Sequence, residues 1–463
     1  MKRFNIKMRI TSSLLVLSMA VMVVACASRL DINPINTIDG TNALSTDQGV
    51  KVALTGAYAA ANLGSPNLLG GAMLYCSEFL ADDGEARFAG TFQGQFEVWS
   101  KQMISNNALA TGMWSAAFST INQTNLILAN LDKVVTQADK EDVEGEARFI
   151  RGLLYFELAK YYGRFWGDGD QNTNLAVPLV LTPTSAVTEA DNRPRATVSA
   201  IYAQAIADLT RAEQLLLETG DGTRATKSGA AAVLARLYLA QGDFARARDA
   251  AQRVIAGGAY GLAATFDQAF TETAAGYNRE NIFRMSVTAQ SGTNNMQQFY
   301  EPAAFGGRGD VRIQASHLAR YEAGDFRAGY FNIASGNRFT NKFIVQFGDV
   351  PYIRFAEMLL TRAECNFRLS TTIGAAPLTD VNVIRARVGL PALTQANLTL
   401  DRILNERRLE LAFEGQLMWD LKRNRAAVVT ANPARSWTSS VLIFPIPQRE
   451  MDTNPSLVQN AGY

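Results

Sequence analysis

The chain has 463 residues, 48% of them hydrophobic, and its 44 Lys and Arg residues nearly balance 43 Asp and Glu residues. This length and apolar share predict a globular protein with a substantial core. The net charge of +1 gives no sign of a nucleic-acid-binding surface. The single histidine, His317, excludes a metal site that needs two imidazoles and most hydrolase chemistry that relies on imidazole.

Residues 1–25 have the layout of a secretory signal peptide, since basic residues precede an apolar run that ends in a small residue. Cys26 follows directly, which looks like a bacterial lipoprotein signal with Cys26 as the lipidation site. The apolar run is shorter than the roughly 20 residues that cross a bilayer. We therefore expect a membrane-tied mature chain, and the absence of aspartate after Cys26 resembles outer-membrane sorting.

The mature chain is predicted to be mainly all-α. Residues 233–255 carry the pattern of a tetratricopeptide helix pair, with the turn at Gly242 and Asp243. Three weaker helical units occur at 114–133 with 146–162, from Val198 onward, and at 352–367 with 381–388. About four such pairs would stack into a scaffold with one continuous core.

Two long stretches, at about 63–105 and 260–350, show no helical periodicity. Loops of this length are usually functional or disordered, and the aromatic content of these stretches argues against disorder. We expect a few short strands in the second stretch, at 281–286 and 342–346.

A series of short motifs runs through the mature chain in a fixed order. The motifs are Leu54-Thr55-Gly56-Ala57-Tyr58, Gly145-Glu146-Ala147-Arg148, Thr226-Lys227, Asn281-Ile282-Phe283, Pro351-Tyr352-Ile353-Arg354, Glu406-Arg407-Arg408-Leu409-Glu410, Trp419-Asp420-Leu421-Lys422-Arg423 and Pro445-Ile446-Pro447. Together they resemble the SusD/RagB family of outer-membrane nutrient-binding lipoproteins. The resemblance implies a cell-surface lipoprotein that caps a SusC-like TonB-dependent transporter and binds oligosaccharides or peptides without cleaving them. It implies no cofactor.

On this resemblance we expect one SusD-like domain over residues 26–463, after the signal peptide at 1–25. Its N-terminal part, 26–225, would hold the first loop insertion. The remainder, 226–463, would hold the tetratricopeptide unit, the second loop insertion and the C-terminal signature region.

Aromatic and polar side chains in the two long stretches are the candidate ligand contacts. Aromatic planes fit the C–H faces of sugar rings, and polar groups hydrogen-bond the hydroxyls. The candidates are Asp83, Arg87, Phe96, Trp99, Asn295, Phe299 and Tyr300. The alternative for each aromatic side chain is packing in the core. Trp114, Trp166 and Trp419 lie in helical or scaffold motifs and are expected in the core.

Glu406, Glu410 and Glu414 raise the alternative of a glycosidase, which uses two carboxyl groups on either side of a sugar bond. Their spacing of four residues places them on one helix face instead, so ion pairs with arginine are the preferred interpretation. The segment Asp168-Gly169-Asp170 begins like a calcium loop. It lacks the later glycine and glutamate of that motif, so we interpret it as a polar turn and expect no metal.

Three hypotheses for the function result. The first is capture of an oligomeric nutrient, most simply an oligosaccharide, and its delivery to a transporter. The second is a tetratricopeptide lipoprotein that binds polypeptide during outer-membrane assembly, which the long aromatic stretches disfavour. The third is the glycosidase, which the shared helix face of the glutamates disfavours.

Overall fold

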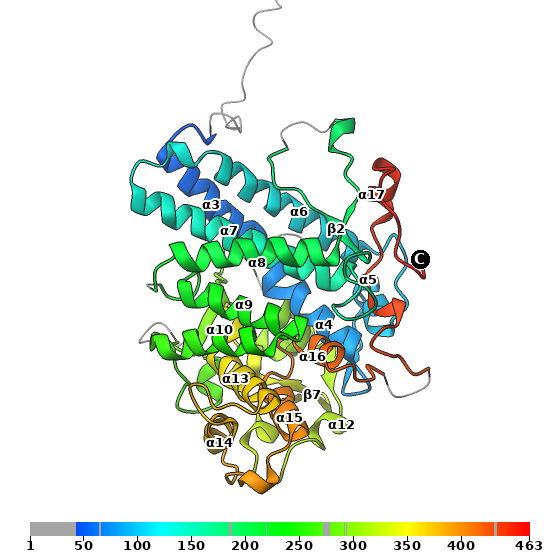
Figure 1. Cartoon of the computed structure of the whole chain (residues 1–463). Helices are drawn as coiled ribbons and strands as arrows, with labels where there is room; N and C mark the ends of the chain where they lie inside the picture. Colours follow the sequence, from blue (N-terminus) through cyan, green and yellow to red (C-terminus); the bar gives the residue numbers. More distant parts are fainter. Residues whose placement is uncertain are drawn as a thin grey trace, which may run out of the picture.

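The computed structural model describes residues 43–63, 66–184, 188–218, 220–271, 278–290, 292, 294–429 and 433–463. The predicted signal peptide and Cys26 lie outside these residues. The described part is mainly helical with small sheets, so the predicted fold class is confirmed (Figure 1). None of its helices is both long and apolar enough to span a membrane.

Long helices stack on one another along the molecule and form the scaffold (Figure 1). Helix α7 packs between α6 and α8, α9 pairs with α10, and α13 packs on α10 and against α14 and α15. The bounds are α3 (Asp47–Leu63), α6 (Ala108–Ala129), α7 (Gln137–Tyr162), α8 (Val198–Leu215), α9 (Lys227–Gln241), α10 (Phe244–Gly257), α13 (Phe355–Leu369), α14 (Pro377–Arg387) and α15 (Leu400–Glu410).

The turn between α9 and α10 lies where the tetratricopeptide pattern predicts it. Gly242 ends α9 with φ of 74°, a left-handed conformation that favours glycine. The carboxylate of Asp243 then accepts the backbone N–H of Arg246 and caps α10.

The stretch at 63–105 is more helical than predicted. It contains the π-helix η2 (Leu68–Ala72) and the helices α4 (Met73–Ala81) and α5 (Gln93–Ser100). Every residue of α4 is buried. A helix that is buried all round has no polar face, so its sequence shows no amphipathic period and the prediction of a loop there was wrong.

The strand prediction is confirmed at one of its two positions. Strand β4 (Asn281–Met285) pairs with β8 (Val350–Arg354) in an antiparallel ribbon. Residues 342–346 form no strand, because the short 3-10 helix η8 (Asn341–Phe343) occupies their start. The helix predicted from residue 352 begins only at Phe355, because β8 precedes it.

A four-stranded antiparallel sheet joins the two long stretches. Its strand order is β1-β5-β7-β6, so β1 from the first stretch pairs with β5 from the second. The strands are β1 (Ala86–Phe88), β5 (Val311–Ile313), β7 (Asn337–Thr340) and β6 (Phe331–Ala334). A second ribbon pairs β2 (Leu175–Pro178) with β3 (Arg195–Thr197).

Short helices complete the described fold. The α-helices among them are α11 (Asn295–Tyr300), α12 (Ala315–Leu318), α16 (Leu417–Arg423) and α17 (Gln448–Thr453). The 3-10 turns are η3 (Leu131–Lys133), η4 (Glu189–Asp191), η5 (Asp267–Ala269), η6 (Ala303–Phe305), η7 (Phe326–Gly329), η9 (Gln395–Asn397) and η10 (Ser440–Leu442).

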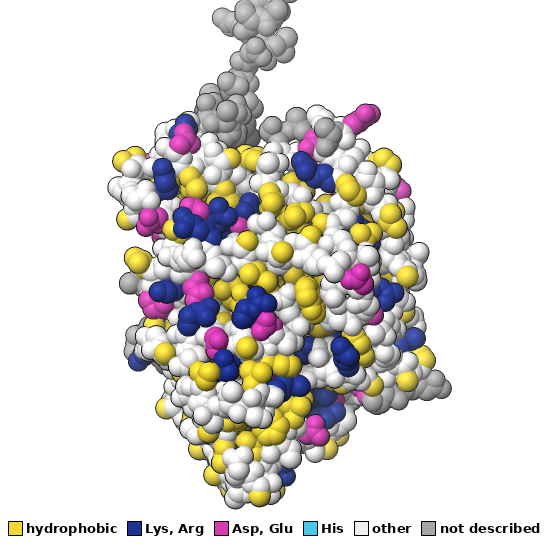
Figure 2. Space-filling model, in the orientation of Figure 1, with side chains coloured by type: hydrophobic (Ala, Val, Ile, Leu, Met, Phe, Trp, Pro, Cys, Tyr) yellow, Lys and Arg dark blue, Asp and Glu magenta, His cyan; other side chains and the backbone are white. Residues whose placement is uncertain are grey.

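The core and the surface match the composition. Trp114 and Trp419 are buried and Trp166 packs against the core, as predicted. Cys76 and Cys365 are buried free thiols. Basic and acidic side chains are interspersed over the helical face seen in Figure 2, which agrees with a net charge near zero.

Candidate functional site

Side chains from the two long stretches meet beside the four-stranded sheet. The ring of Phe299 in α11 lies 5.0 Å from Tyr75, 6.4 Å from Phe88 and 5.8 Å from Phe92, measured between centroids. Sequence positions more than 200 residues apart thus share one aromatic cluster. The predicted binding regions are therefore adjacent in space.

Phe299 and Tyr300 are buried core residues in this region and do not lie on the surface. Phe299 is 2% exposed and Tyr300 is fully buried, with its ring against Phe343 and Phe413. Their proposed role as ligand contacts is corrected by this burial. The spacing of Met296, Phe299 and Tyr300 is that of the inward face of a helix, which was the overlooked signal.

Asn295, the first residue of α11, is half-buried. Its side-chain amide donates to Oε1 of Gln298 at 2.8 Å. This contact fixes the amide within its own short helix.

Three aromatic residues along α5 and its N-cap form a partly exposed group, which we call the aromatic patch: Phe92, Phe96 and Trp99, of which Trp99 is half-buried against the core. They follow one another at intervals of four and three residues, the spacing of one helix face. Phe92 is 39% exposed and Phe96 is 40% exposed. The Phe96 and Trp99 rings lie 5.9 Å apart, and the guanidinium of Arg308 lies 4.6 Å above the Phe92 ring. Phe92 and Arg308 were missed in the sequence, although the helical spacing identifies Phe92.

Trp99 is held in place by its indole N–H. This group donates to Oδ2 of Asp82 at 3.0 Å and to the carbonyl oxygen of Ala86 at 3.2 Å. Asp82 in turn accepts the backbone N–H groups of Glu85 and Ala86 through Oδ1. The ring orientation is therefore set by the protein before any ligand arrives.

Arg87 and Asp83 lie on the segment that joins α4 to β1. Arg87 is exposed on β1, and Asp83 is half-buried in the preceding turn. The structure thus brings Asp83, Arg87, Phe96 and Trp99 into one region, while Asn295 lies on the neighbouring α11.

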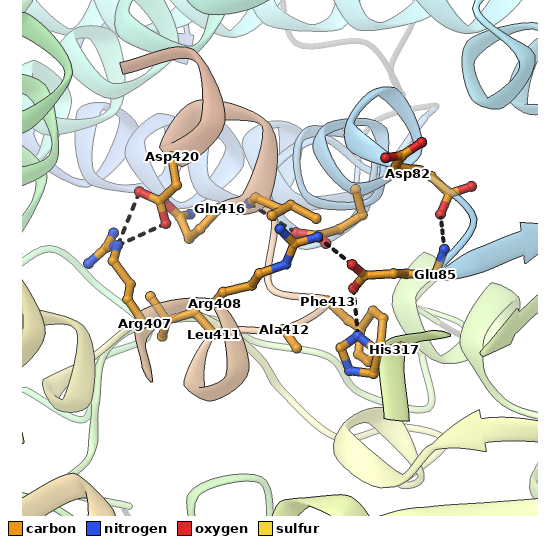
Figure 3. A pocket seen from close by; sticks show the side chains of 13 residues that line it. Asp82, Glu85, His317, Arg407, Arg408, Leu411, Ala412, Phe413, Gln416 and Asp420 are labelled. Carbon is orange, nitrogen blue, oxygen red and sulfur yellow. Dashed lines mark hydrogen bonds and ion pairs between the residues drawn. The ribbon is translucent and has the colours of Figure 1, made fainter. Parts of the chain in front are cut away.

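A small cavity of about 30 Å³ is lined by Asp82, Glu85, His317, Arg408 and Phe413, among others (Figure 3). Glu85 accepts from Arg408 at 2.5 Å and lies 2.9 Å from Nδ1 of His317. Burial lowers the pKa of His317, although Glu85 opposes the shift. The cavity has room for about one water molecule and not for a sugar ring.

A wider groove of about 510 Å³ lies elsewhere, between α6, the segment after β2 and the C-terminal segment. Trp114 and Phe118 of α6 line it together with Arg193 and Arg449. The side chain of Asn122 holds the groove wall by accepting the backbone N–H of Thr184 and donating to its carbonyl oxygen. A groove of this size is in the range of small-ligand sites.

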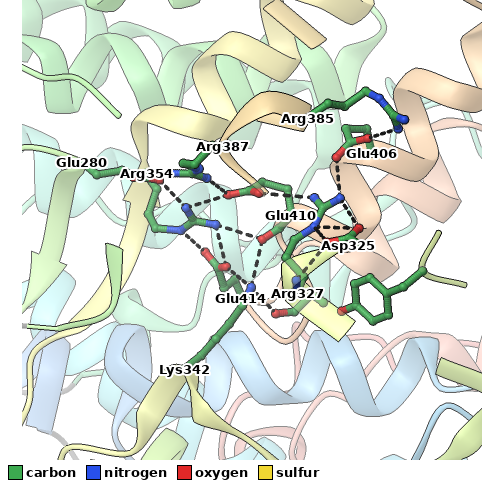
Figure 4. A network of polar contacts seen from close by, with 12 residues as sticks. Glu280, Asp325, Arg327, Lys342, Arg354, Arg385, Arg387, Glu406, Glu410 and Glu414 are labelled. Atoms are coloured by element: carbon green, nitrogen blue, oxygen red, sulfur yellow. Dashed lines mark hydrogen bonds and ion pairs between the residues drawn. The ribbon is translucent and has the colours of Figure 1, made fainter. Parts of the chain in front are cut away.

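The three glutamates of the glycosidase alternative are engaged in ion pairs (Figure 4). Arg354 is buried and lies 3.1 Å from Glu410 and 2.7 Å from Glu414, and Arg327 lies 2.7 Å from Glu406. Burial alone would raise the pKa of Glu410, but Arg387, Arg354 and Arg327 lower it well below its usual range. A carboxyl group that stays ionised is unsuited to the role of general acid in a glycosidase. Burial raises the pKa of Glu406, although Arg327 opposes that shift.

The polar turn at Asp168 is closed by contacts within the chain. Arg164 pairs with Asp168, and Oδ1 of Asp170 accepts the backbone N–H of Asn172. Within the described ranges, no group of three or more His, Cys, Asp or Glu residues could hold a metal ion.

These features define a tetratricopeptide-like helical protein with a small sheet and an exposed aromatic patch. Comparison with known families gives the class. Residues 334–463 match the model of the SusD family, and residues 73–239 match a model described as "Starch-binding associating with outer membrane". The chain belongs to the SusD/RagB family.

Known relatives span the whole chain. A SusD-like protein P2 from Formosa agariphila is 24% identical over 524 aligned residues, which cover 99% of this chain and all of the relative. A SusD superfamily protein from Bacteroides thetaiotaomicron has a TM-score of 0.81 at 24% identity, covering 90% of this chain and 99% of that one. The surface glycan-binding protein A from Bacteroides uniformis has a TM-score of 0.75 at 25% identity, covering 90% and 100%.

Proposed function

We propose that this protein is a lipid-anchored outer-membrane protein that binds an oligosaccharide and delivers it to a SusC-like TonB-dependent transporter, without cleaving it. The family supports a binding role, and one matching family model carries a starch-binding description. The names of two structural neighbours, a putative sugar binding protein from Bacteroides vulgatus and a surface glycan-binding protein, favour glycan over peptide.

The observation that carries the proposal is the aromatic patch on α5. Phe96 exposes 40% of its surface beside Trp99, whose indole is already hydrogen-bonded to Asp82 and Ala86. A fixed and partly exposed aromatic surface can stack on a sugar ring with little loss of side-chain entropy. Arg87 and Asp83 beside it can hydrogen-bond hydroxyl groups.

Calorimetric titration of the mature chain against a panel of oligosaccharides and peptides tests this site. We expect one glycan class to bind, and we expect Phe96→Ala and Trp99→Ala each to weaken its binding at least tenfold. Phe326→Ala is the matched control, because Phe326 is 48% exposed but lies on η7, outside the patch. Binding of peptide alone, or equal loss in the control, would contradict the proposal.

The anchor and the transporter need separate tests. Replacement Cys26→Ala should move the protein from the outer-membrane fraction to a soluble fraction, because the lipid would be lost. Co-purification from detergent extracts should recover a TonB-dependent barrel with the wild type. Unchanged membrane fractionation of the variant, or recovery of no barrel, would contradict that part of the proposal.

A further inference from the structure

Two arginines lie directly opposite each other in the four-stranded sheet. Arg87 on β1 is the register partner of Arg312 on β5. In an antiparallel pair, the Cβ atoms of such partners lie about 4.5–5.5 Å apart and point to the same face, and like charges in this position are destabilising. A group of opposite charge beside the two arginines would offset this repulsion.

Two carboxylates next to these strands in the sequence, Asp310 before β5 and Glu85 before β1, are engaged with other cations. Asp310 pairs with Arg308 at 2.8 Å, and Glu85 accepts from Arg408 and contacts His317. Among the residues that the structure describes, neither Arg87 nor Arg312 forms an ion pair or a side-chain hydrogen bond. Arg87 is exposed, and Nε of Arg312 is buried without a hydrogen-bond partner.

The arginine pair borders the aromatic patch. The carbonyl oxygen of Ala86, the residue before Arg87, accepts the indole N–H of Trp99. Arg87 thus follows directly on the residue that anchors Trp99, so an oligosaccharide of several sugar units that stacks on Phe96 and Trp99 could extend along β1 to the exposed Arg87. Arg312 is half-buried and its Nε is covered without a hydrogen-bond partner, so this side of the arginine pair is not fully solvated.

We propose that Arg87 and Arg312 bind an anionic substituent of an acidic oligosaccharide, a carboxylate or a sulfate ester, while a neighbouring sugar ring stacks on the aromatic patch. This inference rests on the proposed function and narrows its ligand class. Guanidinium groups bind planar carboxylates and tetrahedral oxyanions through paired N–H donors. An anion would also neutralise the like charges across β1 and β5 and supply an acceptor near the arginine pair.

The test is calorimetric titration with three probes of similar length: an oligogalacturonate, a sulfated carrageenan oligosaccharide and a neutral xylo-oligosaccharide. We expect one acidic probe to bind at least tenfold more tightly than the neutral one, with affinity that falls as salt rises. The probe that binds identifies the carboxylate or the sulfate ester as the recognised group.

The double variant Arg87→Gln and Arg312→Gln should lose at least tenfold in affinity for the acidic probe. Arg87→Lys, which keeps the charge but not the paired donors, should lose less. Arg246→Gln is the control, because Arg246 is exposed on α10 and pairs with Asp243. Circular dichroism checks that each variant folds.

The outcomes separate the two proposals. Binding of the neutral probe alone, or an acidic affinity that the double variant and salt leave unchanged, overturns the role of the arginine pair and leaves glycan binding standing. Failure of the folded wild type to bind any oligosaccharide in this set or in the wider panel overturns both.

Discussion

The indole nitrogen of Trp99 lies 3.0 Å from Oδ2 of Asp82, so a buried carboxylate fixes the orientation of a ring on the aromatic patch. Asp82 is 8% exposed and accepts three N–H groups in all, from Trp99, Glu85 and Ala86. The side chain that holds the Trp99 ring therefore belongs to the C-terminal end of α4 and not to α5.

The variant Asp82→Ala tests this support. It leaves buried N–H donors without their acceptor, and each unsatisfied donor lowers the free energy of unfolding by up to about 3 kcal/mol. We therefore expect a lower midpoint of urea unfolding. Glycan affinity should fall as well, because the Trp99 ring is no longer held. Asp452→Ala, at an exposed position on α17, is the control. Wild-type affinity in Asp82→Ala would show that Trp99 does not need this contact.

The buried ion network predicts a large effect on stability. Arg354 lies 2.5 Å from Glu280 and also contacts Glu410 and Glu414, and its side chain is fully buried. In Arg354→Met these carboxylates lose their shared cation, and breaking a buried pair in this way costs about 3–5 kcal/mol. We expect the thermal midpoint to drop by several degrees in calorimetry.

The comparison for that variant is Lys133→Met, because the ion pair of Lys133 with Asp132 is exposed. Exposed pairs contribute about 0–1 kcal/mol. Equal effects of the two substitutions would contradict a structural role for the network.

Local sequence patterns predicted the scaffold well and the site only in part. The α9–α10 pair carries its own turn and cap residues, Gly242 and Asp243, so a short window of sequence specifies it. Helix α4 lacks a polar face, and its burial depends on partners far away in the sequence. The aromatic content of α5 pointed to Phe96 and Trp99, which stay predicted ligand contacts. The same reasoning misplaced Phe299 and Tyr300, which are buried beside Tyr75 and Phe413.

The pairing of Arg87 with Arg312 could not be predicted from the sequence. It depends on the register of two three-residue strands separated by more than 200 residues. Such short strands have little pattern of their own, and tertiary contacts set their register.

Gly415 is predicted to tolerate no side chain. Its φ is 78°, and a Cβ there would lie 2.7 Å from the Cα of Leu74 in the buried helix α4. Gly415→Ala should therefore force the segment before α16 away from α4 and lower stability by more than the roughly 1–2 kcal/mol of a left-handed alanine. Its backbone N–H also donates to Glu78 at 2.8 Å, a bond that the shift would weaken.

Gly258→Ala gives the matched comparison, since Gly258 has φ of 71° but a Cβ added there would meet no other atom within 4 Å. That variant should lose only the roughly 1–2 kcal/mol of stability that a left-handed alanine costs. Chemical denaturation of both proteins measures the difference, and equal midpoints would contradict the packing argument.

Glu301 gives a prediction for pH. Its side chain is fully buried and has no cationic partner within the described part of the chain, although Oε2 accepts from Asn332 at 3.0 Å. Burial raises the pKa of Glu301 from 4.5 to about 8. Between these values the folded state keeps a proton that the unfolded state has lost, so this group's contribution to stability is full below pH 4.5 and decreases as the pH rises to about 8.

The variant Glu301→Gln should remove this dependence, because an amide keeps the shape but does not ionise. Unfolding free energies at pH 5 and pH 8 should therefore differ less in the variant than in the wild type, by an amount of the order of a few kcal/mol. Glu189→Gln, at an exposed position on η4, should leave the wild-type dependence intact. The same pH profile in Glu301→Gln and the wild type would mean that Glu301 is ionised in the folded protein, and that water or a conformational change relieves its burial.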